Sequence, residues 1–187
     1  ARRQLTAQTV TRFGLGFAPD TWDSLVRAMK ALGYSEQELF DGGLVRHGKS
    51  GGVYDTFRNR LMFPVIDVRG NVIGFSGRIL GDGEPKYMNS PETIVFSKSH
   101  NLFALNLAKK SKCGYIILAE GNIDVASLHQ AGFDSAVASL GTSLTPEQAR
   151  LLSRYTGEIV IAYDNDGAGQ KASQRAIGIL EKLEVRV

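Results

Sequence analysis

The carboxyl-terminal part of the chain alternates short apolar runs with helical patterns, and this alternation constrains the fold more than any other feature. The apolar runs have the length and composition of buried strands and lie at residues 115–120, 135–140 and 158–164. Helical patterns follow each run, at residues 124–131, 145–155 and 168–183, and another strand is expected at 184–187. Thr145 and Pro146 are typical of the start of a helix. Because continuous apolar strands joined by helices form parallel sheets covered on both faces, we expect a mixed α/β fold with a mostly parallel sheet flanked by helices.

The first 112 residues are less regular. Helical stretches are expected at Thr6–Arg12, Thr21–Leu32, Ser35–Phe40 and 101–110. Two apolar runs flank the turn at 68–70 and predict a hairpin, whereas the polar, proline-containing residues 81–93 predict a loop. We therefore expect a smaller α+β subdomain over residues 1–112, followed by the parallel-sheet domain over residues 113–187.

Charge is distributed unevenly between these two parts. The 187 residues carry a formal net charge of +3. Residues 1–112 hold 16 Lys and Arg and 10 Asp and Glu, a net +6, whereas residues 113–187 hold 6 and 9, a net −3. Such asymmetry favours one surface for a polyanion and another for cations, although ordinary protein surfaces also differ by a few charges.

Composition disfavours several classes of protein. No apolar run approaches the roughly 18 residues that a membrane span needs, and the first residues lack the apolar stretch of a signal peptide, so we expect a cytoplasmic protein. The single cysteine, Cys113, excludes an internal disulfide and a multi-thiolate zinc site, and its apolar neighbours predict a buried thiol. The three histidines are far apart and lack zinc-ligand spacing, so no zinc is expected in this chain.

Acidic residues follow two of the expected strands. Glu120 ends the first apolar run, and Asp164 and Asp166 follow the third. Ligands of open parallel sheets bind outside the carboxyl ends of the strands. If these two strands are neighbours, three carboxylates converge, with Asp124 on the next helix as a candidate fourth. Clustered carboxylates repel one another unless they hold a cation, and oxygen-only ligands select hard cations such as Mg²⁺.

The turn after Asp164 has a second feature. Residues 166–169 read D-G-A-G, and these small residues let a substrate backbone approach. The helix that follows is expected to offer its N-terminal amides to a phosphate. Taken alone, D-x-D is more often a helix cap than a ligand set. Joined to a strand-end Glu two βα units earlier, it is more specific.

These residues resemble the Toprim domain, which is shared by bacterial primases, type IA and type II topoisomerases, and some nucleases and recombination proteins. Its hallmark is a Glu after one strand and D-x-D after a later one, here Glu120 and Asp164 with Asp166. Three segments resemble the versions in bacterial DnaG-type primases, namely 120–125, 136–145 and 162–172. Three upstream segments resemble primase-specific regions outside the Toprim domain, namely 58–67, 74–78 and 85–93.

The resemblance implies a DNA-directed RNA polymerase that makes short RNA primers on single-stranded DNA by two-metal nucleotidyl transfer. It implies that Asp164 and Asp166 bind Mg²⁺ or Mn²⁺. Glu120 would be a metal-associated carboxylate or a proton-transfer group, and Asp124 a supporting acid. The fold would be a Toprim-type sheet after a basic α+β subdomain.

The resemblance also implies that basic motifs of the first part line the template and nucleotide path. The residues at the matching positions are Arg58, Arg60, Arg78, Lys86, Tyr87 and Asn89. Arg suits this role because its guanidinium can bind two phosphate oxygens at once, and Tyr can stack on a base. The alternative is that these basic residues only solvate a hairpin and that Tyr87 belongs to the core, as is expected of Trp22.

The implied partners are ribonucleoside triphosphates, a single-stranded DNA template, an RNA–DNA primer duplex and a replicative helicase, the last through a domain outside this chain. A further acidic Toprim motif is expected beyond Val187, so this fragment is expected to bind metal weakly and to prime poorly. Two other functions stay open from the residues alone. One is a Toprim nuclease or topoisomerase-like enzyme, and the other is a nucleic-acid-binding module with an inactive acidic site.

Overall fold

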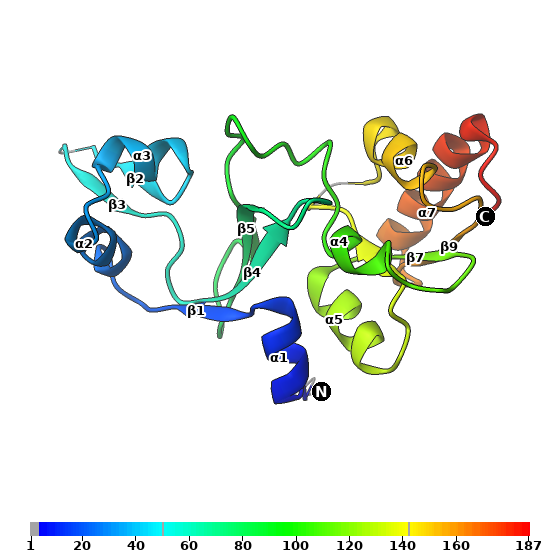
Figure 1. Ribbon diagram of the computed structural model, residues 1–187, viewed down its shortest axis with the longest axis horizontal. Coiled ribbons are helices and arrows are strands. Elements are labelled where there is room, and N and C mark those ends of the chain that lie inside the picture. The colour runs from blue at the N-terminus through cyan, green and yellow to red at the C-terminus, as the bar shows by residue number, and fades with distance from the viewer. Residues whose placement is uncertain (1–3, 50, 142) are drawn as a thin grey trace. The chain divides into compact units, whose positions relative to one another are not determined.

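The computed structural model describes residues 4–49, 51–141 and 143–187 and divides the chain into two compact units (Figure 1). The parallel-sheet unit consists of Ala1–Phe13, Val65–Val72 and Lys98–Val187, and the antiparallel-sheet unit of Gly14–Pro64 and Ile73–Ser97. No helix in the described ranges is both long enough and apolar enough to cross a membrane. The predicted boundary between a basic subdomain and a Toprim-type domain at residue 112 stays a prediction. The two compact units do not divide there, because the parallel-sheet unit includes residues from both sides of it.

The parallel-sheet unit has the predicted order of strands and helices. Its three strands pair in parallel, in the order β8-β7-β9, so β7 is central. A short 3-10 helix, η1, follows the last α-helix. The elements are α1 (Ala7–Phe13), α4 (Leu105–Ala108), β7 (Ile116–Ala119), α5 (Asn122–Gln130), β8 (Ala136–Ala138), α6 (Pro146–Leu152), β9 (Ile159–Ala162), α7 (Gly167–Leu180) and η1 (Glu181–Leu183).

Helices lie on both faces of this sheet, and β7 and β8 are buried throughout, whereas Val160 and Ala162 of the edge strand β9 are exposed. Successive residues of a strand face opposite sides of a sheet. Ile116 and Leu118 of β7 belong to a buried cluster with Leu152 of α6 and Leu180 of α7. Helix α5 packs against β8 and β7, and Figure 1 shows it on the side away from α6 and α7. The predicted helix cap is also confirmed, since Thr145 forms a capping box and Pro146 begins α6.

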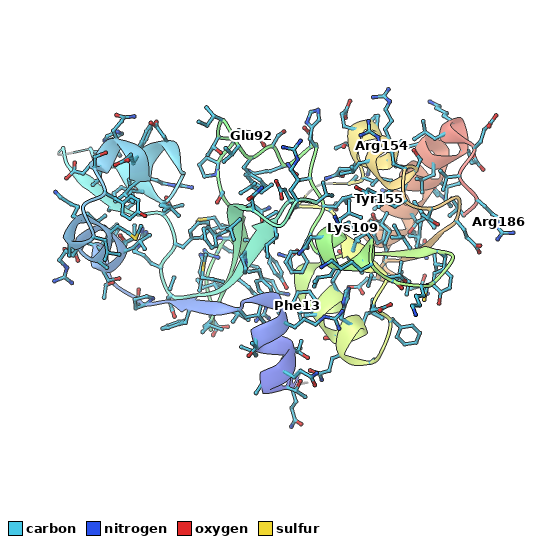
Figure 2. All side chains as sticks on the ribbon, in the orientation of Figure 1. Phe13, Glu92, Lys109, Arg154, Tyr155 and Arg186 are labelled. Atoms are coloured by element: carbon cyan, nitrogen blue, oxygen red, sulfur yellow. The ribbon has the colours of Figure 1, made fainter. Side chains whose placement is uncertain are left out.

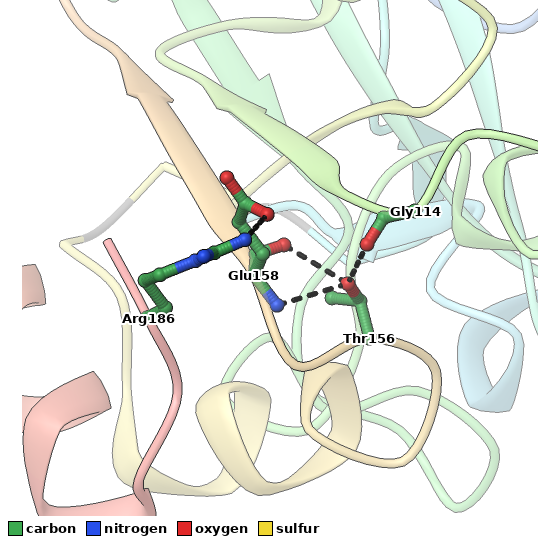
Figure 3. Close-up of polar contacts among 4 residues, drawn as sticks. All are labelled: Gly114, Thr156, Glu158 and Arg186. Atoms are coloured by element: carbon green, nitrogen blue, oxygen red, sulfur yellow. Dashed lines mark hydrogen bonds and ion pairs between the residues drawn. The ribbon is translucent and has the colours of Figure 1, made fainter.

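The last residues of the chain run beside the outer edge of β9. The backbone N–H of Ile159 donates to the carbonyl of Arg186 at 2.8 Å, and Arg186 forms a parallel bridge with Glu158. Figure 3 shows the Arg186 guanidinium paired with the Glu158 carboxylate and the Thr156 hydroxyl donating to the Gly114 carbonyl. The strand expected at 184–187 is therefore present as a single bridge in the predicted direction.

Helix α1 packs within the parallel-sheet unit although it comes from the other end of the chain. Phe13, labelled in Figure 2, stacks on Phe103 with ring centroids 5.8 Å apart and meets the edge of His129 at 5.1 Å. The Gln130 side chain accepts hydrogen bonds from the Thr6 backbone N–H at 2.7 Å and from the Thr9 hydroxyl at 2.9 Å. Gln130 therefore holds the start of α1 against α5.

The antiparallel-sheet unit contains a four-stranded sheet in the order β1-β4-β5-β6 and a separate β2-β3 pair. The predicted hairpin corresponds to β4 and β5, and its tip, Val65–Val72, belongs to the parallel-sheet unit. The elements are β1 (Gly16–Ala18), α2 (Ser24–Ala31), α3 (Glu36–Asp41), β2 (Val45–His47), β3 (Val53–Asp55), β4 (Arg60–Ile66), β5 (Val72–Ile79) and β6 (Tyr87–Asn89).

Three local predictions were wrong. The segment 81–93 is not entirely a loop, because β6 pairs with β5 in the middle of it. The helix expected at 101–110 is only the four residues of α4, since Phe103 instead bridges to Ala138 of β8. Cys113 is exposed rather than buried, because the buried part of the apolar run begins only at Ile116.

Candidate metal centre and nucleic-acid contacts

The acidic residues lie at the carboxyl edge of two adjacent strands. Strands β7 and β9 are hydrogen-bonded neighbours in parallel register, with Ala119 opposite Ala162. Glu120 follows β7 directly, and Asp164 follows β9 after one intervening residue. The condition for convergence of these acids, that the two strands are neighbours, is therefore met, and both residues lie at the edge where ligands of parallel sheets bind.

Glu120 and Asp164 are joined by a hydrogen bond. The Asp164 backbone N–H donates to Oε2 of Glu120 at 3.1 Å. Both residues are exposed, so their carboxylates are accessible from solvent. The contact fixes the Glu120 carboxylate over the end of β9, close to the turn that carries the two aspartates.

Asp166 caps helix α7. Its Oδ1 accepts the backbone N–H of Ala168 at 3.0 Å and that of Gly169 at 2.7 Å. A carboxylate at this position also interacts favourably with the positive end of the helix dipole. The prediction that these amides are offered to a phosphate was wrong, because Asp166 already accepts their hydrogen bonds. The cap uses Oδ1 alone.

Gly169 allows the first turn of α7 to lie against the backbone of Asp164. A β-carbon on Gly169 would stand 1.9 Å from the Asp164 carbonyl oxygen, far inside van der Waals contact. Gly169 therefore serves close packing of this helix on the acidic strand end. This packing fixes the backbone from which Asp164 projects.

Asp124 lies in the first turn of α5 and is half-buried. Its Oδ2 is 3.2 Å from the position that a β-carbon on Gly121 would occupy, so it lies against the turn that follows Glu120. The β7–α5 turn and the β9–α7 turn thus each carry carboxylates, as the sequence predicted for adjacent strand ends.

The carboxylates are not arranged as a ready-made metal cage. Across residues 4–49, 51–141 and 143–187, no group of three or more His, Cys, Asp and Glu side chains is placed to hold a metal ion. Glu120 is turned toward the Asp164 amide, and Asp166 toward α7. The donors fit a hard cation in kind, because all are carboxylates and Glu120, Asp164 and Asp166 are exposed. Metal binding by these residues stays a prediction.

Tyr163 is a residue of this edge that the sequence did not single out. Its hydroxyl oxygen is buried and has no hydrogen-bond partner among the residues that the structure describes. Burial, followed by the negative charge of Glu120, raises the pKa of Tyr163 to about 12. The phenol therefore stays protonated near neutral pH. No pattern marked it, because a tyrosine at the end of an apolar strand is ordinary.

Four of the six predicted nucleic-acid contacts lie together on β5 and at β6. Arg78 of β5 is directly opposite Tyr87 of β6, and its guanidinium carbon is 6.0 Å from the centre of the Tyr87 ring. Lys86 precedes Tyr87 and is exposed, and Asn89 is half-buried two residues further along β6. A cationic and an aromatic side chain are thus paired across two strands.

Arg60 has a different environment from its neighbours in the sequence. It is only 4% exposed, and its Nη1 donates to the carbonyls of Gly77 at 3.1 Å and Pro85 at 2.9 Å. Burial, followed by the charge of Arg58, lowers the pKa of Arg60. Its guanidinium joins β4 to β5 and to the segment before β6, which is a structural role. The predicted contact with template or nucleotide gains no support from this geometry.

Arg58 lies in an aromatic cluster that contains Trp22. Its guanidinium carbon is 4.1 Å from the centre of the Trp22 ring and 5.2 Å from that of Tyr54. Trp22 is 65% exposed, so its prediction as a core residue was wrong. An open pocket lies beside it, lined by Trp22, Tyr54 and residues of the β2–β3 connection. The signal that marks this site is spatial, because Trp22 and Arg58 are far apart in the sequence.

Comparisons with family models match both parts of the chain. A model described as "DNA primase catalytic core, N-terminal domain" matches residues 1–109, and one described as "Toprim-like" matches residues 117–187. A DNA primase of Clostridium acetobutylicum is 52% identical over 181 residues, which is 96% of this chain and 30% of that protein. A DNA primase of Escherichia coli K12 is 42% identical, covering 94% of this chain and 31% of its own length. The chain thus spans about a third of these relatives.

Solved primase structures have the same fold. The E. coli primase catalytic core superposes with a TM-score of 0.86 at 42% identity, covering 94% of this chain and 57% of that chain. The zinc-binding and RNA polymerase domains of Aquifex aeolicus primase give 0.89 at 38% identity, covering 97% and 45%. A DnaG primase catalytic domain bound to ssDNA gives 0.82 at 42% identity, covering 92% and 56%. These matches favour the primase interpretation over a nuclease or topoisomerase, and the chain belongs to the bacterial DNA primase family.

Proposed function

We propose that this chain carries the part of a primase that synthesises RNA primers on single-stranded DNA by divalent-metal nucleotidyl transfer. The observation that carries the proposal is the hydrogen bond between Glu120 and the Asp164 amide at the carboxyl edge of β7 and β9. The Glu120 carboxylate thus lies against the Asp164 backbone, and both residues are exposed at the edge where ligands of parallel sheets bind. The Toprim family generally uses divalent metal ions, and Mg²⁺ or Mn²⁺ is proposed here.

When bound, such an ion would neutralise phosphate charge and orient a nucleoside triphosphate against a primer end. Asp164 and Asp166 are proposed to hold it. Glu120 contributes a carboxylate that associates with the metal or accepts a proton, and Asp124 is proposed to support it from α5. Gly169 and the α7 cap keep the two aspartates on a rigid turn, as a precisely built site requires.

The antiparallel-sheet unit is proposed to contact single-stranded DNA and ribonucleoside triphosphates through paired cations and aromatic rings. The Arg78–Tyr87 pair and the Arg58–Trp22 cluster both combine a positive charge for phosphate with a flat face for a base. Lys86 and Asn89 lie beside the first pair. Contacts with a primer duplex, and with a replicative helicase through other parts of a longer protein, are also proposed.

The proposal is tested by RNA synthesis on single-stranded DNA with Mg²⁺ or Mn²⁺, in a chain extended beyond Val187. Asp164→Ala is expected to reduce the rate at least 100-fold. Glu147→Gln is the matched control, because Glu147 is an acid of α6 in a surface ion pair with Arg150. Primer synthesis at the wild-type rate by Asp164→Ala would contradict the proposed site. Metal-independent DNA binding without any synthesis would indicate a binding module instead.

A further inference from the structure

The Tyr163 hydroxyl is a buried donor without a partner at the edge of the acidic site. The Tyr163 side chain packs against the core cluster of the parallel-sheet unit. Its oxygen has no hydrogen-bond partner in the part of the chain that the structure describes. An unpartnered buried hydroxyl is energetically costly, and such groups in native proteins call for an explanation. Phenylalanine would fill the same space without this cost.

The sheet register makes Tyr163 the neighbour of Glu120 across the two strand ends. Ala119 and Ala162 are paired in register, so Glu120 and Tyr163 are the next residues on the two adjacent chains. Paired residues of parallel strands project to the same side of a sheet.

The Glu120 carboxylate has one oxygen available for a second contact. Its Oε2 accepts the Asp164 backbone N–H, whereas Oε1 makes no hydrogen bond with the described residues. Carboxylates that bind metals are usually held by a neighbouring hydrogen-bond donor, which sets their orientation. A neutral phenol suits this task, because it orients the carboxylate without adding a positive charge that competes with the cation.

We propose that Tyr163 is a positioning residue for Glu120, whose carboxylate accepts the Tyr163 hydroxyl when it turns toward a divalent cation. The inference rests on the proposed function, because it gives Glu120 a place in metal binding. In this arrangement Glu120 has two supports from one strand end: the Asp164 amide and the Tyr163 hydroxyl.

The test compares Tyr163→Phe with wild type by Mn²⁺ titration calorimetry and thermal unfolding, in a chain extended beyond Val187. Loss of the hydroxyl is expected to weaken Mn²⁺ binding about 10-fold. The melting temperature without metal is expected to stay the same or rise, because an unpartnered buried group is removed. A merely structural tyrosine would change the melting temperature without changing the affinity for Mn²⁺.

Ser135→Ala is the matched control. Ser135 is 1% exposed, and its hydroxyl is also buried without a partner. It precedes β8, at the amino edge of the same parallel sheet, opposite the edge that carries Glu120. Ser135→Ala is therefore expected to leave Mn²⁺ binding unchanged.

A Glu120→Gln background separates this inference from the proposed function. Tyr163→Phe is expected to have less effect on Mn²⁺ affinity there than in wild type, because the pair acts as a unit. Equal Mn²⁺ affinity in wild type and Tyr163→Phe overturns the positioning role alone. Equal affinity in wild type and Asp164→Ala overturns the metal site itself.

Discussion

Gly169 lies so close to Asp164 that a β-carbon at Gly169 would stand 1.9 Å from the Asp164 carbonyl oxygen. The contact joins the first turn of α7 to the end of β9. The turn that carries Asp164 and Asp166 is therefore held by close backbone packing, and the position of its carboxylates depends on a residue that carries no functional group.

Gly169→Ala is expected to displace the β9–α7 turn. The added methyl group cannot be accommodated without backbone movement, so the free energy of unfolding should fall by about 1–3 kcal/mol. Primer synthesis should fall further, because Asp164 moves. Gly178→Ala, in the same helix with open space around it, should instead stabilise by up to about 1 kcal/mol. Chemical denaturation measures both, and equal stabilities for the two variants would contradict the account.

Trp22 is the only tryptophan of the chain, so its fluorescence reports on the proposed DNA contact directly. Single-stranded DNA is expected to quench its emission, and Trp22→Ala should weaken DNA binding by about 1–3 kcal/mol in an anisotropy assay. Phe133→Ala, an exposed aromatic of the parallel-sheet unit, is the control. Unchanged emission on saturation with DNA would remove Trp22 from the path.

Removal of the Arg60 side chain is expected to lower stability, whereas removal of the Arg78 side chain is expected to weaken DNA binding. Arg60→Ala leaves the Gly77 and Pro85 carbonyls without their donor, so the free energy of unfolding should fall by about 2 kcal/mol. Arg78→Ala should leave stability near wild type but weaken DNA binding and reduce its dependence on salt. Thermal unfolding and salt titrations of DNA binding measure the two effects. A destabilised Arg78→Ala protein would contradict the assignment of Arg78 to binding.

His129 should make the protein less stable in acid. Its Nε2 donates to the Ala136 carbonyl at 2.9 Å, and its Nδ1 is buried without a partner. Burial lowers the pKa of His129 in the folded protein, against the smaller opposing effect of that hydrogen bond. The unfolded chain, with the ordinary value near 6.5, therefore binds a proton that the folded protein does not.

The contribution of His129 to the free energy of unfolding is thus complete above pH 6.5 and is lost as the pH falls below it, by at most about 1.4 kcal/mol per pH unit. Urea denaturation between pH 7.5 and 5 measures this slope. His129→Gln should flatten it, whereas His47→Gln, at an exposed position of β2, should not. The same slope in wild type and His129→Gln would show that another group is responsible.

The sequence predicts the parallel sheet and its acidic edge well, because both depend on local patterns. Apolar runs identify β7 and β9, and Glu120 and Asp164 follow them in the sequence. Because ligands of parallel sheets bind at the carboxyl ends of the strands, these two residues are expected at one site once the strands are neighbours. The capping of α6 by Thr145 is equally local.

The features that the sequence did not predict depend on contacts with residues distant in the sequence. In the turn before α7 they depend on which of two roles a carboxylate takes. Strand β6 forms in a polar segment only because β5 supplies its pairing edge. Arg60 is buried because two carbonyls, from Gly77 and Pro85, surround its guanidinium. Asp166 fits both a metal ligand and a helix cap, and sequence alone does not choose between them. Trp22 is exposed because of where it lies in the folded antiparallel-sheet unit, which no local pattern indicates.

Glu120, Asp164 and Asp166 are proposed to bind a divalent cation at the edge of β7 and β9. Anomalous diffraction from crystals soaked in Mn²⁺ tests this proposal most directly. A peak is expected within about 2–2.6 Å of Asp164 and Glu120 carboxylate oxygens. A peak bound only by other residues, or no peak at Mn²⁺ concentrations that support primer synthesis, would contradict it.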